Sequence, residues 1–202
     1  MRRALFIALL ALALPMAAFA SSSVDFTNSG GTLTGTNSGF TLSGSVLIAV
    51  NGLNGGGLIT GSNLGSLTFS TGALASGSLQ MGGTFAAGGS FTITGNGTNG
   101  IPNGVIFSGA FSGPVAWTLV TLPDGTHNYT LIGAVSGTMA SGFATNGVTV
   151  QLTVNTGKGF FNGSTTVSSG DTNIVVPEPG TLGLLGTGLV GIAGILRRKL
   201  SR

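Results

Sequence analysis

The chain of 202 residues has no cysteine, one histidine, one tryptophan and one tyrosine, and only 5% of its residues are charged. Without cysteine it can form neither a disulfide framework nor a metal site with thiolate ligands. Glycine is abundant instead, with 38 residues spread along the chain. The chemistry available to this protein therefore rests on few charged groups and on many neutral hydroxyl and amide groups.

The positive charge of the chain lies at its two ends. Six of the seven basic residues fall within positions 2–3 and 197–202, and Lys158 is the only one between them. The region between the ends is nearly uncharged and slightly acidic; its carboxylates are Asp25, Asp124, Asp171 and Glu178. Such a region cannot hold a phosphate backbone by electrostatic attraction, which excludes nucleic acid as a partner.

Residues 1–20 have the organisation of a secretory signal peptide. Its parts are a basic pair (Arg2, Arg3), an apolar stretch (residues 4–14) and a small-x-small cleavage site (Ala18, Phe19, Ala20). We expect signal peptidase to cleave after Ala20 and the general secretory route to export a mature chain that begins at Ser21. The arginine pair leaves the twin-arginine route as an alternative, although the polar context of such signals is missing here.

Residues 174–202 have the order of a sorting signal. An extended turn comes first, then an apolar segment, then a basic end: Val176, Pro177, Glu178 and Pro179; residues 181–196; and Arg197, Arg198 and Lys199. The two prolines keep the chain around Glu178 open to another protein. The apolar segment predicts a transmembrane helix of about 16 residues, roughly 24 Å long. It can span a bilayer core of about 30 Å if the basic side chains snorkel and the bilayer thins. The basic tail at 197–202 then marks the cytoplasmic side.

This arrangement resembles the PEP-CTERM sorting signal of Gram-negative bacteria, in which a Pro-Glu-Pro motif, a short Gly- and Leu-rich membrane helix and an Arg-rich tail follow one another. The resemblance implies recognition by an exosortase, a membrane-embedded cysteine transpeptidase-like enzyme, and cleavage near the motif. The protein would then pass from an inner-membrane intermediate to the cell surface or the exterior. Two alternatives remain: an ordinary C-terminal anchor that is never cut, and a helix whose glycines allow close packing with another helix.

Between the two signals, residues 21–173 predict one exported all-β domain. Seven segments alternate apolar and small polar residues with the period of a half-buried strand: 41–50, 65–70, 90–95, 104–109, 115–122, 128–133 and 148–154. Helix signals are absent, and only 72–81 comes near a helical composition. Turn residues separate the segments, namely Pro123-Asp124-Gly125 and the Asn-Gly pairs at 51–52, 103–104 and 146–147.

Many short strands with frequent turn signals favour an antiparallel β-sandwich. A β-solenoid is the alternative, since stacked coils also bury small residues. No fixed repeat is visible along the chain, and the lone Trp117, preceded by Phe107 and Phe111, suits one compact core. The sandwich is therefore the favoured architecture.

Candidates for catalysis are few. His127 follows the Pro123-Asp124-Gly125 turn, where a lone histidine is most simply a solvated turn residue, and no Gly-x-Ser-x-Gly nucleophile accompanies it. A carboxylate pair for glycoside hydrolysis would have to come from Asp25, Asp124 and Asp171, which are far apart in sequence. Residues 170–173 offer two side-chain ligands, too few for calcium. We therefore predict no catalytic residue, no metal and no cofactor.

The sequence favours a non-enzymatic cell-surface or extracellular-matrix protein that signal peptidase and exosortase process. The resemblance adds exopolysaccharide and biofilm as a setting, and neutral hydroxyl and amide groups suit polysaccharide contacts that salt does not weaken. Scarce aromatic residues do not support lectin-like specificity. One alternative is a secreted carbohydrate-binding module or hydrolase that uses Asp124 and His127. Another is a self-assembling adhesin subunit, because strands with few charges are prone to edge pairing.

Overall fold

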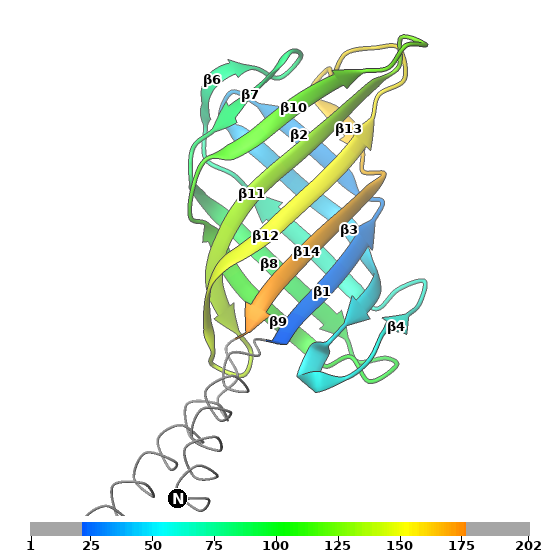
Figure 1. The fold of residues 1–202 in the computed structure, drawn as a ribbon, viewed down its shortest axis with the longest axis vertical. Helices are drawn as coiled ribbons and strands as arrows, with labels where there is room; N and C mark the ends of the chain where they lie inside the picture. The colour runs from blue at the N-terminus through cyan, green and yellow to red at the C-terminus, as the bar shows by residue number, and fades with distance from the viewer. Residues whose placement is uncertain (1–21, 177–202) are drawn as a thin grey trace, which may run out of the picture. The chain divides into compact units, whose positions relative to one another are not determined.

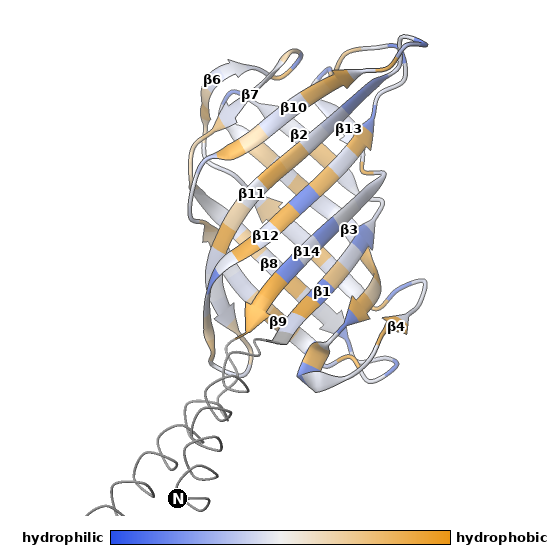
Figure 2. Ribbon diagram, viewed as in Figure 1, coloured by the Kyte–Doolittle hydropathy of each residue, from blue (hydrophilic) through white to orange (hydrophobic). Residues whose placement is uncertain are grey.

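The alternating segments form fourteen β-strands that are hydrogen-bonded into one sheet (Figure 1). The structure, a computed structural model, describes residues 22–176. Its strands are β1 (Ser22–Ser29), β2 (Thr32–Thr36), β3 (Gly39–Asn51), β4 (Ile59–Thr60), β5 (Gly65–Ser70), β6 (Leu74–Ser78), β7 (Gly82–Phe85), β8 (Gly88–Asn96), β9 (Asn103–Phe111), β10 (Val115–Thr121), β11 (His127–Met139), β12 (Ala144–Asn155), β13 (Ser164–Thr166) and β14 (Ser169–Val176). One 3-10 turn, η1 (Leu53–Gly55), follows β3. Apolar and polar residues alternate along the long strands, as the banding in Figure 2 shows, so one face of the sheet is apolar.

The antiparallel all-β class predicted from the sequence is confirmed. Each of the seven predicted segments coincides with a strand, namely β3, β5, β8, β9, β10, β11 and β12, and only Leu122 of the segment 115–122 lies beyond its strand. The stretch 72–81, which came nearest to a helical composition, contains β6. The prediction missed the other seven strands, namely β1, β2, β4, β6, β7, β13 and β14. In β1 and β14 at least half of the residues are Ser, Thr, Asn or Asp.

Eight of the strands close into a barrel. The order β12-β14-β1-β3-β5-β8-β9-β11 is completed by a pairing of β11 with β12, so the sheet returns to its first strand. Neighbouring strands in this ring are antiparallel. The expected two-sheet sandwich is therefore not confirmed, and residues 22–176 form a barrel instead of the stacked coils of a solenoid. The period of two shows only that each strand has one buried face, and a single curved sheet buries that face as well as two stacked sheets do.

Two long strands, β3 and β11, each pair with one strand over their first half and with another strand over their second half on the same side. The two ends of the barrel are therefore built from different strands. β3 pairs with β2 over residues 39–43 and with β1 over residues 46–51. β11 pairs with β10 over residues 127–132 and with β9 over residues 135–139. We call the end with β2, β6, β7, β10 and β13 the hairpin end (Figure 1). The opposite end, where β1 begins and β14 ends, is the terminal end.

The predicted turn residues have three different outcomes. The Pro123-Asp124-Gly125 turn does connect β10 to β11, and the Leu122 N–H donates to the Thr126 carbonyl at 2.8 Å. Asn103 and Gly104 instead begin β9. Asn146 and Gly147, expected in a loop, lie inside β12, where Gly147 is the extra residue of a β-bulge with φ +85°. Glycine is suited to this position because a left-handed φ strains other residues.

Aromatic rings fill the interior in two clusters. The first, at the hairpin end, consists of Phe40, Phe85, Trp117, Tyr129 and Phe161, and the second of Phe69, Phe91, Phe107 and Phe111. Trp117 stacks on Tyr129 with ring centroids 4.8 Å apart. The Phe40 and Trp117 ring centroids are 4.6 Å apart, and the two ring planes are tilted relative to each other. None of these rings is more than 2% exposed, so the barrel encloses a packed core.

Candidate functional site

The predicted sorting site begins where the barrel ends. β14 runs to Val176, and Pro177 follows with no spacer. Other parts of the predicted signals lie outside the described residues: Ala18 and Ala20; Pro177, Glu178 and Pro179; the helix at 181–196; and Arg197, Arg198 and Lys199. Between residues 22 and 176 the structure contains no helix of the length and hydropathy that a membrane crossing requires.

Polar side chains on the outer face join the first strand of the barrel to its last. The Thr27 hydroxyl on β1 donates to Asp171 Oδ1 on β14 at 2.9 Å, and the Asn173 amide on β14 donates to Asp25 Oδ1 on β1. Because the two strands are antiparallel neighbours with this register, the start of β1 lies beside the end of β14. The two ends of the mature domain therefore leave the barrel at the same, terminal end.

The same bonds account for two of the carboxylates considered for chemistry. Asp25 and Asp171 each accept a hydrogen bond across the β1–β14 pair, while Thr172, between Asp171 and Asn173, is buried. Within the described residues no group of three or more His, Cys, Asp or Glu side chains is placed to hold a metal ion. The 170–173 segment is thus part of a strand pairing.

Asp124 and His127 are engaged by other partners rather than by each other. Asp124 accepts hydrogen bonds from the Thr126 N–H at 2.9 Å and from the Thr126 hydroxyl at 3.0 Å. His127 stacks on Phe160 with ring centroids 4.3 Å apart, and its Nδ1 lies 2.9 Å from the Thr121 hydroxyl. His127 is 8% exposed, so the expectation of a solvated turn residue was wrong. His127 is the first residue of β11 and lies on the buried face of that strand. Its position beside a turn in the sequence did not indicate this burial.

The Asp124 turn predicts a pH dependence of stability. The hydrogen bonds from the backbone and then the hydroxyl of Thr126 hold the pKa of the Asp124 carboxyl below its ordinary value of 3.8. A lowered pKa stabilises the folded state above pH 3.8, and this contribution is lost as the pH falls through the folded-state pKa. In denaturant unfolding at several pH values, Asp124→Asn should be less stable than the wild type near neutral pH, with the difference vanishing in acid. A difference that stays constant with pH would contradict this.

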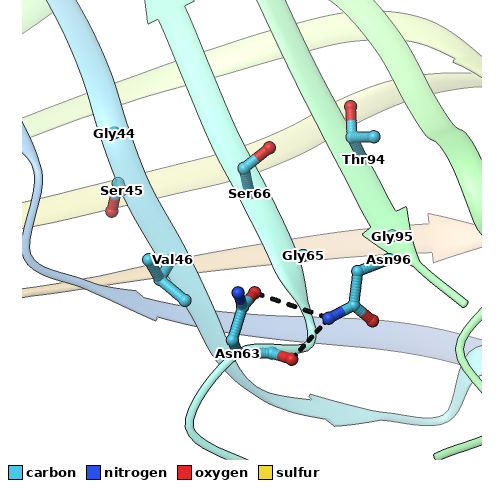
Figure 3. A pocket seen from close by; sticks show the side chains of 9 residues that line it. All are labelled: Gly44, Ser45, Val46, Asn63, Gly65, Ser66, Thr94, Gly95 and Asn96. Carbon is cyan, nitrogen blue, oxygen red and sulfur yellow. Dashed lines mark hydrogen bonds between the residues drawn. The ribbon is translucent and has the colours of Figure 1, made fainter. Parts of the chain in front are cut away.

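A first hollow, of about 280 Å³, lies over β3, β5 and β8 on the outer face of the barrel (Figure 3). It is lined by Gly44, Ser45, Val46, Asn63, Gly65, Ser66, Thr94, Gly95 and Asn96. The Asn96 amide donates to the Asn63 carbonyl at 2.6 Å (Figure 3). Asn96 Oδ1 accepts from the Thr98 N–H at 3.0 Å. The Asn96 side chain at its rim is therefore already hydrogen-bonded. Three of the nine lining residues are glycines, which offer no side-chain group to a ligand.

A second hollow, of about 450 Å³, lies at the hairpin end, and we call it the hairpin-end hollow. Three segments far apart in sequence meet there: residues 35–37 of β2 and its following turn, residues 78–80 after β6, and residues 161–163 before β13. Its lining consists of Gly35, Asn37, Ser78, Leu79, Gln80, Phe161, Asn162 and Gly163. No local motif links these residues, so the sequence alone did not predict the site.

Comparison with known proteins bears on the C-terminal part of the chain. Residues 175–199 match the family model described as the PEP-CTERM protein-sorting motif. The chain carries a PEP-CTERM sorting motif. The resemblance seen in the sequence is therefore confirmed, and the motif marks an exported protein that is sorted at the membrane and processed by exosortase. No curated protein and no solved structure matched the chain.

The PEP-CTERM motif covers only the end of the chain and leaves the barrel to be interpreted from its own geometry. Its matched range begins at Val175, within β14, so folded strand and sorting motif share two residues. Val175 is 41% exposed although its neighbour Ile174 is fully buried. The barrel thus closes immediately upstream of the segment that exosortase processes.

Proposed function

We propose that this protein is a non-enzymatic component of the cell surface or extracellular matrix, displayed as a folded barrel after exosortase acts at its PEP-CTERM motif. One observation carries the proposal: the closed barrel passes into the motif without a linker, and its first strand begins at the same end. Cleavage at Ala20 and near Pro179 would leave little more than the barrel. The exported unit is then the barrel itself.

The environment of the carboxylates supports a non-enzymatic role. Asp25, Asp124 and Asp171 each accept a hydrogen bond from a neighbouring side chain in a turn or strand pair. His127 is buried against Phe160. General acid and base catalysis requires such groups to converge on a substrate. These residues instead have roles in the packing and pairing of β1, β11 and β14.

The outer surface suits a hydrated polymer. Outward positions of β12, among them Thr149, Gln151 and Thr153, carry neutral groups. Contacts made by such groups are hydrogen bonds, which ionic strength weakens far less than it weakens exposed ion pairs. These neutral outward groups support exopolysaccharide of a matrix as the partner.

The barrel gives less support to self-assembly through strand edges. Closure pairs both sides of its eight strands, and among the described residues the strands at the margins of the sheet are β4, β6 and β13, of two, five and three residues. Long, exposed edges promote pairing between molecules, and short ones suppress it. We therefore place the adhesin alternative behind a monomeric matrix component.

The proposal predicts that the chain is cleaved at two sites. Intact mass spectrometry can measure both cleavages in protein recovered from the cell surface, the polymer fraction and the medium. With exosortase present, the mature form should lack residues 1–20 and everything beyond about Pro179, and should appear in the polymer fraction. In cells without exosortase, or in the P177A/E178A/P179A variant, the C-terminus should stay uncut. D124N is the matched control, because it also removes one carboxylate and should be processed normally. An uncut wild-type C-terminus in both strains would instead indicate a plain membrane anchor.

A further inference from the structure

The walls of the hairpin-end hollow are fixed by the aromatic core beneath it. Trp117 Nε1 donates to the Leu79 carbonyl at 2.8 Å, and the Tyr129 hydroxyl donates to the Gln80 carbonyl at 2.7 Å. The same Tyr129 oxygen accepts from the Phe161 N–H at 3.1 Å. Two of the three wall segments are therefore held by one stacked Trp-Tyr pair, and the hollow is preformed.

The third wall is held by the backbone. The Gly35 N–H donates to the Gly163 carbonyl at 2.9 Å, and the Leu74 N–H donates to the Asn37 carbonyl at 2.9 Å. Gly35 also lies so close to the core that an added Cβ would be 2.4 Å from the Phe40 ring. In all three segments these hydrogen bonds are made by main-chain groups of the segment, so they do not use the side chains of Asn37, Gln80 and Asn162.

Three amide side chains line this preformed hollow without partners. Asn37, Gln80 and Asn162 come from the three different walls, and all three are exposed. Within residues 22–176 none of their side-chain amides has a hydrogen bond. Asn96 and Asn155, by contrast, use their amides to join neighbouring segments. Three free amides present donors and acceptors together around a space within the size range of ligand sites, about 300–1,000 Å³.

The lining restricts the chemistry of the ligand. No charged residue lines the hollow, so it offers neither a cation for an acidic group nor a carboxylate for a basic one. An extended peptide would have to add to the edge of β6, but β6 has five residues, its first N–H is already bonded to Asn37, and Gly77 has φ +80°. Strand addition requires a longer run of free main-chain groups. A neutral ligand with several hydroxyl groups fits what remains.

We propose that the hairpin-end hollow binds a short stretch of a neutral polysaccharide, with the amides of Asn37, Gln80 and Asn162 hydrogen-bonding its hydroxyl groups. This assignment rests on the proposed function, because a protein of the cell surface or matrix is in contact with polysaccharide. The hollow lies at the end of the barrel opposite the start of β1 and the end of β14 (Figure 1). A barrel that is held or released at its terminal end therefore presents the hollow at its far end.

The experiment uses the full chain in a zwitterionic detergent that has no sugar headgroup. Calorimetric titration with cellotetraose, maltotetraose and tetra-N-acetylchitotetraose should give saturable binding of at least one, unchanged between about 0.05 and 0.5 M salt because the contacts are uncharged. The N37A/Q80A/N162A variant should bind at least about tenfold more weakly, since three hydrogen bonds are lost. It should melt as the wild type does, because none of the three side chains takes part in a hydrogen bond within residues 22–176.

Two further variants separate this site from general surface adhesion. Asn162→Phe should reduce binding by occupying the hollow. Asn103→Ala, which removes an exposed amide at the start of β9, should leave affinity within about twofold of the wild type. No saturable binding of any of the three oligosaccharides, or equal binding by the wild type and the triple variant, would overturn the assignment. So would affinity that falls steeply with salt. The mass measurement of processing is independent, so a failure here is distinguishable from a failure of the proposed function.

Discussion

Replacing Trp117 with alanine is expected to lower the free energy of unfolding by about 3–5 kcal/mol, the usual range for deletion of a buried Trp or Phe. Its ring stacks on Tyr129 at 4.8 Å and packs on Phe40 at 4.6 Å. The variant also removes the donor that holds the Leu79 carbonyl at 2.8 Å. A cavity and an unpaired carbonyl would therefore form together at the hairpin end, where β10 joins β7 and β11.

Urea unfolding of the full chain in detergent, followed by far-ultraviolet circular dichroism, measures this loss without relying on the single tryptophan. Trp117→Phe should lose less, because an aromatic ring still fills most of the space while the Leu79 carbonyl lacks its donor. Met81→Ala is the exposed control, with its side chain 67% exposed, and should change stability by no more than about 0.5 kcal/mol. Equal losses for Trp117→Ala and Met81→Ala would contradict the packing described for the first aromatic cluster.

Replacing Gly65 with valine is expected to lower the free energy of unfolding by about 2–6 kcal/mol. Gly65 begins β5 with φ +149°, and a Cβ there would be 2.0 Å from the Thr94 carbonyl oxygen and 2.8 Å from Gly95 Cα. Both contacts are main-chain atoms of the neighbouring strand, so neither can move aside without opening the β5–β8 pairing. Overpacking contributes about 1–3 kcal/mol and the unfavourable φ about 1–3 kcal/mol more.

Two other glycines separate these contributions in the same unfolding assay. Gly100 has φ +83°, and a Cβ added to it would have no atom within 4 Å, so Gly100→Val isolates backbone strain. Gly57 has free space and no left-handed φ, so Gly57→Val should be nearly neutral. The expected order of destabilisation is Gly65, then Gly100, then Gly57. If Gly65→Val and Gly57→Val behaved alike, the close approach of β5 and β8 would be wrong.

Strands with a clear period of two could be predicted because the signal is local. Residues 65–70 alternate apolar and polar side chains without interruption, and β5 begins and ends there. β1 and β14 escaped prediction because polar groups such as Asn28 and Thr172 occupy inward positions. Asn28 is buried against Ser45, to which its amide donates at 2.7 Å, so the partner that makes this burial possible lies on β3. No window of sequence around Asn28 contains that information.

The candidate sites divide in the same way. The sorting motif is a contiguous string, so sequence comparison located it at residues 175–199 before any fold was considered. The hairpin-end hollow is built from three separate segments, and each of its amides looks like an ordinary loop residue in the sequence. His127 was misplaced for a related reason: its neighbours in the chain form a turn, while Phe160, which covers it, comes from the segment after β12.

The all-β class, seven of the strands and the PEP-CTERM motif could be inferred from the amino-acid sequence, because alternation, turn residues and contiguous motifs are properties of short segments. The pairing of β1 with β14, which closes the barrel and brings the two ends of the domain together, emerges only from the three-dimensional structure. Closure depends on strand order and curvature, because it requires β1 to pair with β14, whose residues Thr27 and Asp171 are 144 positions apart in sequence. Local patterns specify which face of a strand is buried, whereas the strand that covers this face depends on the pairing of all strands in the sheet.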